Sequence, residues 1–334
     1  MRLTREALLR YASEAAAQRA RAHRDVVCIY LIGSLLRDRP LLGGTTDIDL
    51  VVVHIGDPPV EREVVRVTQD VTLDILHHPQ SLYQQPRNLR QHPWLGPALY
   101  HNPIVLHDTQ HWFEFAQSGV TAQYNRPDFV MARARQLAEK ARGLWLAMEN
   151  GDSPYSDPIS PYLETLEAAA NAVAMLSGPP LSERRLLMDF PERATAVGRP
   201  GMAAGLVDLL GGEQADAETL RTWLGEWEKA LRAAGGLADG PVRLSAARLP
   251  YYRRAVEAML DGGHSQDALW PLLVTWLAAA GRLRAGDPSQ EAWMETRRTL
   301  ELDADSLVGR LSALDAYLDS LEETLEDWAA ENGA

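Results

Sequence analysis

The chain has 334 residues, of which 46% are hydrophobic and 24% charged, and its formal net charge is −13. This length is enough for two domains with ordinary cores. Residues 1–124 hold 12 Lys and Arg against 13 Asp and Glu, a net of −1, whereas residues 125–334 hold 21 against 33, a net of −12. Because surfaces that bind nucleic acid normally carry an excess of basic side chains, this charge disfavours nucleic acid as a partner.

The cysteine content and the hydropathy pattern indicate the compartment. Cys28 is the only cysteine, so no disulfide can form within the chain. The first residues carry frequent charges without the apolar core of a signal peptide, and no later segment approaches the roughly 18 uninterrupted apolar residues of a membrane span. We therefore expect a soluble, cytoplasmic protein without membrane association.

The N-terminal third of the chain combines helical spacing with short apolar runs. One amphipathic helix is expected first, followed by apolar runs rich in β-branched residues, which predict strands. A further short strand and a helix come after a proline-broken segment. The expected helices are 3–23 and 109–118, and the expected strands are 26–33, 47–53, 71–78 and 103–108.

Two polar pairs stand at the ends of the first two predicted strands. Gly33 and Ser34 end the first strand, and Asp47 and Asp49 begin the second. Since alternate side chains of a strand share a face, the two carboxylates would lie about 6–7 Å apart on one face. Carboxylates this close repel unless a cation lies between them, and oxygen ligands favour a hard ion such as Mg²⁺. The glycine would let a phosphate approach the backbone, where the serine offers an amide and a hydroxyl.

The third predicted strand carries Asp74 between two aliphatic residues. A carboxylate inside an apolar strand is costly to bury unless it is paired or bound to a metal ion. Asp70, at a predicted turn, competes for the same place. The residues thus predict that Asp74 is paired with another group or bound to a metal ion.

From residue 129 onward strand patterns nearly vanish and apolar residues recur at helical spacing. We place the domain boundary in segment 119–128 and expect a domain of residues 1–124 and a helical domain of residues 125–334. The predicted fold class is α+β, a mixed sheet with flanking helices followed by an all-α bundle. The leucine stripe of the last helix is typical of a core or of a homodimer seam. The expected helices are 129–149, 161–176, 201–211, 216–234, 248–261, 267–284, 289–302 and 305–330.

The order Gly-Ser, loop, Asp-x-Asp and third acid resembles the nucleotidyltransferase superfamily that includes DNA polymerase beta, and its small bacterial members similar to aminoglycoside nucleotidyltransferases. The resemblance implies that Gly33 and Ser34 hold the β- and γ-phosphates of ATP or another NTP. It implies that Asp47 and Asp49 bind two Mg²⁺ ions. It also implies that Asp74 binds metal or accepts the proton of the acceptor hydroxyl.

In similar enzymes a helical bundle closes the acceptor side, and a Lys or Arg of its first helix contacts the triphosphate. This role would fall to Lys140, for which a plain surface position is the alternative. Glu164, Glu167 and Asn171 recur at steps of three and four, and such a stripe would suit a cationic acceptor if it were not simply exposed to solvent.

The first hypothesis is therefore a Mg²⁺-dependent nucleotidyltransferase. It would transfer NMP, with AMP from ATP as the first choice, to a hydroxyl of a small and cationic acceptor and release pyrophosphate. The alternatives are transfer to a protein or toxin partner, and a catalytically silent nucleotide-binding protein.

Overall fold

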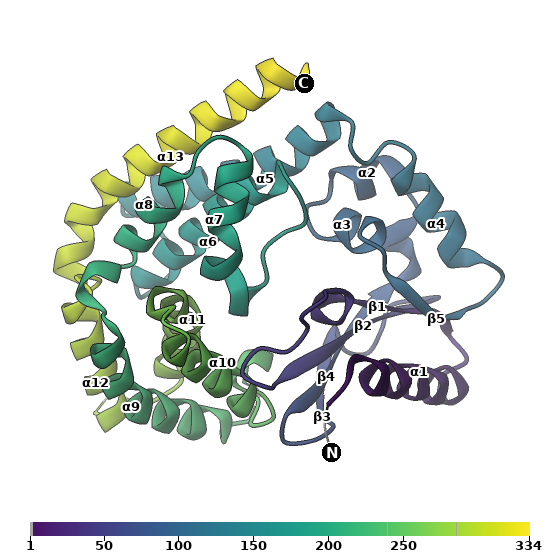
Figure 1. Cartoon of the computed structure of the whole chain (residues 1–334), viewed down its shortest axis with the longest axis horizontal. Helices are drawn as coiled ribbons and strands as arrows, with labels where there is room; N and C mark the ends of the chain where they lie inside the picture. The colour runs from purple at the N-terminus through teal and green to yellow at the C-terminus, as the bar shows by residue number, and fades with distance from the viewer. Residues whose placement is uncertain (1–2, 239, 285) are drawn as a thin grey trace. The chain divides into compact units, whose positions relative to one another are not determined.

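The computed structural model describes residues 3–238, 240–284 and 286–334. The chain divides into two compact units, Met1–Tyr124 with Pro241–Ala258, and Asn125–Gly240 with Met259–Ala334. The predicted α+β class is confirmed, since a mixed sheet with flanking helices is followed by a long series of helices (Figure 1). The segment Pro241–Ala258 belongs to the first unit although it lies far along the chain.

The first unit is built on a five-stranded sheet with the strand order β3-β4-β2-β1-β5. β2 and β4 are parallel, and the other neighbouring pairs are antiparallel. The edge strand β3 was not predicted from the sequence. Its five residues include three charged ones and no apolar alternation, because an edge strand is half exposed. The strands are β1 (Val26–Ile32), β2 (Thr46–His54), β3 (Arg62–Arg66), β4 (Val71–Pro79) and β5 (Ile104–Asp108).

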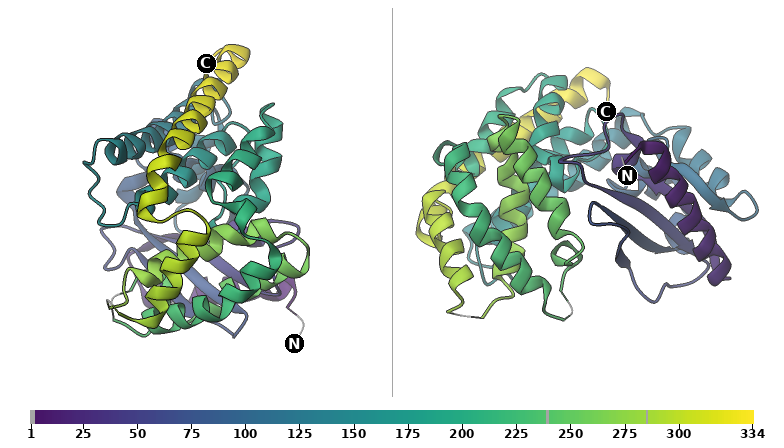
Figure 2. Two further views of the ribbon diagram at one scale, coloured as in Figure 1. Left: turned by 90° about the vertical axis from the view of Figure 1, so that its left-hand side faces the viewer. Right: turned by 60° about the horizontal axis from the view of Figure 1, so that its bottom comes forward.

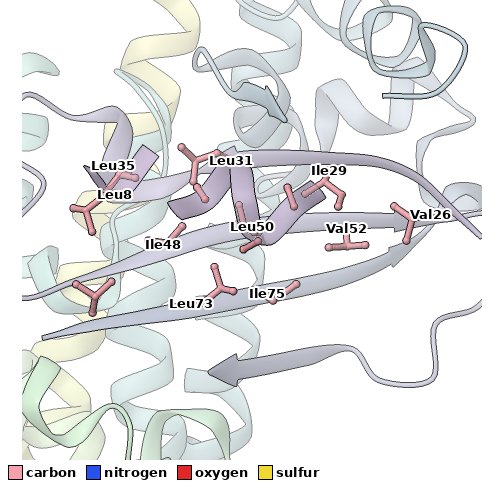
Figure 3. Packing of buried hydrophobic residues seen from close by; sticks show 14 residues of the cluster. Leu8, Val26, Ile29, Leu31, Leu35, Ile48, Leu50, Val52, Leu73 and Ile75 are labelled. Atoms are coloured by element: carbon pink, nitrogen blue, oxygen red, sulfur yellow. The ribbon is translucent and has the colours of Figure 1, made fainter. Parts of the chain in front are cut away.

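The two faces of this sheet carry different layers. Helix α1 (Arg5–Ala22) packs on one face, where alternate residues of β2 and β4 form the main core of the unit. Figure 3 shows Leu8 of α1 in the same cluster as Ile48, Leu50 and Ile75. On the opposite face, Val51 and other buried residues pack with side chains of α2 (Pro86–Gln91), α3 (Leu95–Tyr100) and α4 (Trp112–Thr121).

This alternation positions the predicted acids. The residues of β2 on the second face are, in order, Asp47, Asp49, Val51 and Val53. The face therefore begins with carboxylates where the strand begins and becomes apolar further along.

The second unit is built of helices, and its interior contains α6 and α11, which are buried over most of their length. Helix α13 packs along α5, α6 and α8 and is the long yellow helix of Figure 2. Most of its leucine stripe is buried within the unit, while Leu311 is half-buried. The helices are α5 (Pro127–Glu149), α6 (Ile159–Met175), α7 (Leu186–Ala196), α8 (Gly201–Leu209), α9 (Ala217–Gly235), α11 (Leu269–Ala280), α12 (Pro288–Thr299) and α13 (Ala304–Asn332), while α10 (Leu249–Asp261) begins in the first unit. None of the helices in the described part of the chain combines the length and the hydropathy that a bilayer crossing requires.

A chain of polar side chains crosses the second core of the first unit. The Tyr30 and Tyr83 hydroxyls are 2.9 Å apart, and the Tyr83 hydroxyl is 2.6 Å from Nδ1 of His78. Burial lowers the pKa of His78 to about 4. The imidazole therefore stays neutral in the folded protein over a pH range in which an unfolded histidine is protonated.

Acidification should destabilise the first unit through His78. The unfolded state binds a proton below pH of about 6.5 and the folded state does not, so stability is lost as pH falls below that value. Between pH 7 and pH 5 the wild type should lose about 2 kcal/mol more free energy of unfolding than His78→Asn. Urea unfolding of the full chain at both pH values measures this difference. The exposed His111 provides the control, since His111→Asn should keep the pH response of the wild type.

Candidate metal and nucleotide site

The three predicted acids form one cluster. Asp49 and Asp74 are register partners across the parallel β2–β4 pair, and Asp47 lies two residues before Asp49 on the same face. One carboxylate oxygen of each lies within 4.8 Å of those of the other two. Asp47 and Asp74 are only 6% and 3% exposed. Asp70 instead pairs with Arg254, so the structure brings Asp74 and not its competitor to the other two acids.

The Gly-Ser pair lies against this cluster. Gly33 has φ +80°, and a Cβ atom there would overlap with the Asp49 carboxylate. The backbone N–H of Ser34 donates a hydrogen bond to that carboxylate, and the Ser34 hydroxyl is 3.0 Å from the Thr46 hydroxyl. Glycine is therefore required for two reasons, the left-handed backbone and the close approach of Asp49. In this structure the pair positions an acid; contact with phosphate stays a prediction.

One acid of the cluster, Asp49, resists ionisation. Burial, followed by the negative charge of Asp47, raises the pKa of Asp49 to about 7. The Asp49 carboxylate therefore resists ionising beside the charge of Asp47 near neutral pH. A bound cation would remove the resistance, because it stabilises both charges at once.

Two arginines partly neutralise the cluster, and neither was predicted from the sequence. Arg62 of β3 is diagonal to Asp74 across the β3–β4 pair and donates to both of its oxygens, from Nε at 2.8 Å and from Nη2 at 2.6 Å. Nη2 of Arg248 also contacts Oδ2 of Asp74 and lies 3.7 Å from Oδ2 of Asp47. Three carboxylates thus face two guanidinium groups.

Arg248 comes from the segment Pro241–Ala258, which several contacts hold on the first unit. Arg66 donates to the carbonyl of Ala246, and the Thr45 hydroxyl donates to the carbonyl of Tyr251 at 3.4 Å. Gly43, with φ +59°, lies so close to the carbonyl of Arg254 that a Cβ atom would overlap with it. The loop before β2 and the edge of the sheet therefore position this segment beside the acids.

A weak signal for Arg248 was present in the sequence. Residues 241–258 contain four arginines and one glutamate, a net of +3 inside a region whose net charge is −12. A basic stretch in an acidic region indicates an acidic neighbour, but it does not reveal which one.

The donor set fits a hard divalent cation. It consists of carboxylate oxygens on two rigid, paired strands, which is the chemistry that Mg²⁺ and Mn²⁺ prefer. Asp47 would bind such an ion in competition with Arg248, whose Nη2 lies 3.7 Å from Oδ2 of Asp47. Asp74 would bind it only by sharing or exchanging its arginine partners.

The remaining candidates lie in the second unit. Lys140 pairs with Glu164 at 2.7 Å, and the Tyr155 hydroxyl also donates to Glu164. Asn171 is fully buried, where its side chain accepts from the backbone N–H of Leu181 at 2.7 Å. The polar stripe of α6 is therefore buried at Asn171 and paired with Lys140 at Glu164. The role of Lys140 at a triphosphate stays a prediction.

The sequence matches no family model and no curated protein. Among solved structures, it is similar to a nucleotidyltransferase-like protein from Exiguobacterium sibiricum 255-15, at 14% identity and a TM-score of 0.28, with 97% of this chain and 92% of that chain covered.

Gly33→Ala should damage both the fold and the cluster. The positive φ alone costs about 1–3 kcal/mol, and the added methyl group would also push the Asp49 carboxylate away. Gly44→Ala is the matched control, since Gly44 has φ +72° with no atom within 4 Å of the added Cβ. Urea unfolding should show a loss for both variants. Calorimetric Mn²⁺ titration should show weaker binding only for Gly33→Ala, and equal Mn²⁺ affinities would contradict the positioning role.

Proposed function

We propose that the protein is a metal-dependent nucleotidyltransferase, which transfers a nucleoside monophosphate from a triphosphate, with ATP as the first choice, to a hydroxyl acceptor and releases pyrophosphate. One observation carries the proposal. Three carboxylates from two paired strands meet within 4.8 Å, two of them nearly fully buried, beside a glycine of positive φ. Burying such a cluster is costly, and a site for a hard cation gives it a purpose.

Asp47 and Asp49 would hold two Mg²⁺ ions together with the triphosphate. When bound, these ions supply Lewis acidity at the α-phosphate and neutralise charge on the attacking and leaving oxygens. The protein contributes rigidity, because both acids stand on a strand that is paired on each side. The N–H of Ser34 holds the Asp49 carboxylate in place and so supports this arrangement.

Asp74 has two candidate roles, metal ligand and proton acceptor. Both of its oxygens accept hydrogen bonds from Arg62. Each oxygen keeps a second lone pair beside Arg62, and this lone pair can accept a proton or bind a metal ion. Asp74 is therefore proposed for both roles.

The acceptor is proposed from charge. The acidic composition of residues 125–334 favours a cationic small molecule and disfavours nucleic acid. The Glu164 carboxylate already has a lysine and a tyrosine as partners, so this residue gives the cationic acceptor little support. Transfer to a protein or toxin partner is the second candidate, and a silent nucleotide-binding protein is the third.

A transfer assay with α-labelled NTPs tests this function. The protein is incubated with Mg²⁺ or Mn²⁺ and, in turn, with aminoglycosides, cell-extract protein and RNA. Asp47→Asn should reduce transfer by roughly 100-fold or more, because it removes a direct metal ligand. Asp57→Asn, at an exposed acid just after β2, should retain wild-type transfer.

The assay also separates the alternatives. Labelled protein would favour the second candidate, and labelled RNA would overturn the preference for a small acceptor. Metal-dependent nucleotide binding without any transfer would favour the silent protein. Absence of both binding and transfer would overturn the proposed function.

A further inference from the structure

The guanidinium of Arg248 occupies part of the space that a metal ion at the acidic cluster would use. It contacts Oδ2 of Asp74 and lies 3.7 Å from Oδ2 of Asp47, two of the acids whose oxygens converge. Arg248 is only 5% exposed, and its guanidinium lies over the ring of Tyr251 at 5.3 Å from the ring centroid. The side chain is therefore built into the site and is not a surface group that happens to reach it.

A metal ion and this guanidinium cannot share the cluster in the present arrangement. An ion bound to these carboxylates would lie about 2.0–2.6 Å from their oxygens. The two positive centres would then face each other across the same oxygen atoms, in a buried place where water screens them poorly. One of them has to leave when the other binds.

We propose that Arg248 is the resting counter-ion of the acidic site, and that a metal ion enters together with a nucleoside triphosphate, whose phosphates accept the displaced guanidinium. The competition for the carboxylates stands on the geometry alone, whereas the identity of the anion as a triphosphate rests on the proposed function.

The charges explain why the anion matters. A divalent ion that bound alone would leave a buried guanidinium without its carboxylate partner, which is strongly unfavourable. A triphosphate brings negative oxygens to the same place and gives the arginine a new bidentate partner. Metal and nucleotide should therefore strengthen each other's binding, and Arg248 is the residue that couples them.

The exchange needs only a local movement. Arg248 lies between the short turn Val242–Leu244 and the start of α10. Backbone contacts through Ala246 and Tyr251 anchor the segment on both sides of it. The arginine side chain can therefore change partner while the segment stays in place.

Calorimetric titration of the full chain with Mn²⁺, first without nucleotide, tests the competition. R248M should bind Mn²⁺ at least tenfold more tightly than the wild type, because no guanidinium has to be displaced. R254M is the matched control, since Arg254 lies on the same segment and pairs with Asp70 outside the cluster. Its Mn²⁺ affinity should equal that of the wild type. An unchanged affinity in R248M, or the same increase in R254M, would overturn the proposal.

A second titration, with α,β-methylene ATP present, tests the coupling. The analogue should strengthen Mn²⁺ binding to the wild type at least tenfold and should have a much smaller effect on R248M. Equal strengthening in both proteins would overturn the role of Arg248 in coupling. The first titration contains no nucleotide. It therefore tests the competition between Mn²⁺ and Arg248 even if the protein does not transfer nucleotides.

Two further variants cover the case in which R248M does not fold, which circular dichroism would show. R248Q keeps a hydrogen-bond donor without the charge, and it should bind Mn²⁺ tightly, as expected for R248M. R248K keeps the charge and should bind Mn²⁺ weakly, like the wild type. Weak binding by R248Q or tight binding by R248K would overturn the proposal.

Discussion

The first unit depends on one electrostatic constraint, the repulsion between three carboxylates that the sheet holds together. Parallel pairing of β2 with β4 places Asp49 opposite Asp74, and strand alternation adds Asp47 on the same face. Burial makes this repulsion expensive, because little water screens the charges. The neighbouring structure compensates for it through the N–H of Ser34 and the guanidinium groups of Arg62 and Arg248. These contacts come from three separate regions of the chain.

The same constraint accounts for the form of the surrounding loops. A glycine is needed at position 33 because the Asp49 carboxylate takes the space of a side chain, and Gly43 is needed where the backbone of Arg254 approaches. Segment 241–258 belongs to the first unit and brings the guanidinium of Arg248 to the acids. Features that look like separate motifs in the sequence are therefore parts of one charge balance.

Local patterns were sufficient for much of the fold. The strands β1, β2, β4 and β5 were predicted because their apolar runs are buried on the sheet, and most helices were predicted from their apolar spacing. The edge strand β3 and the short helix α7 were not predicted. β3 has little apolar content because its position exposes it, and its pairing with β4 is a long-range property that no short window of sequence contains.

The sequence alone determined the acids, the glycine and the order along the chain of the strands that carry them. The reason is that the spacing of Asp47 and Asp49 and the apolar neighbours of Asp74 are local features that follow strand geometry. Only the tertiary structure decided which charges meet those acids. Arg62 reaches Asp74 from an edge strand that was not predicted. Arg248 reaches Asp74 from a segment that lies far along the chain. These partners depend on the folded geometry and on the need to neutralise buried charge. The spacing of neighbouring residues in the sequence does not reveal either condition.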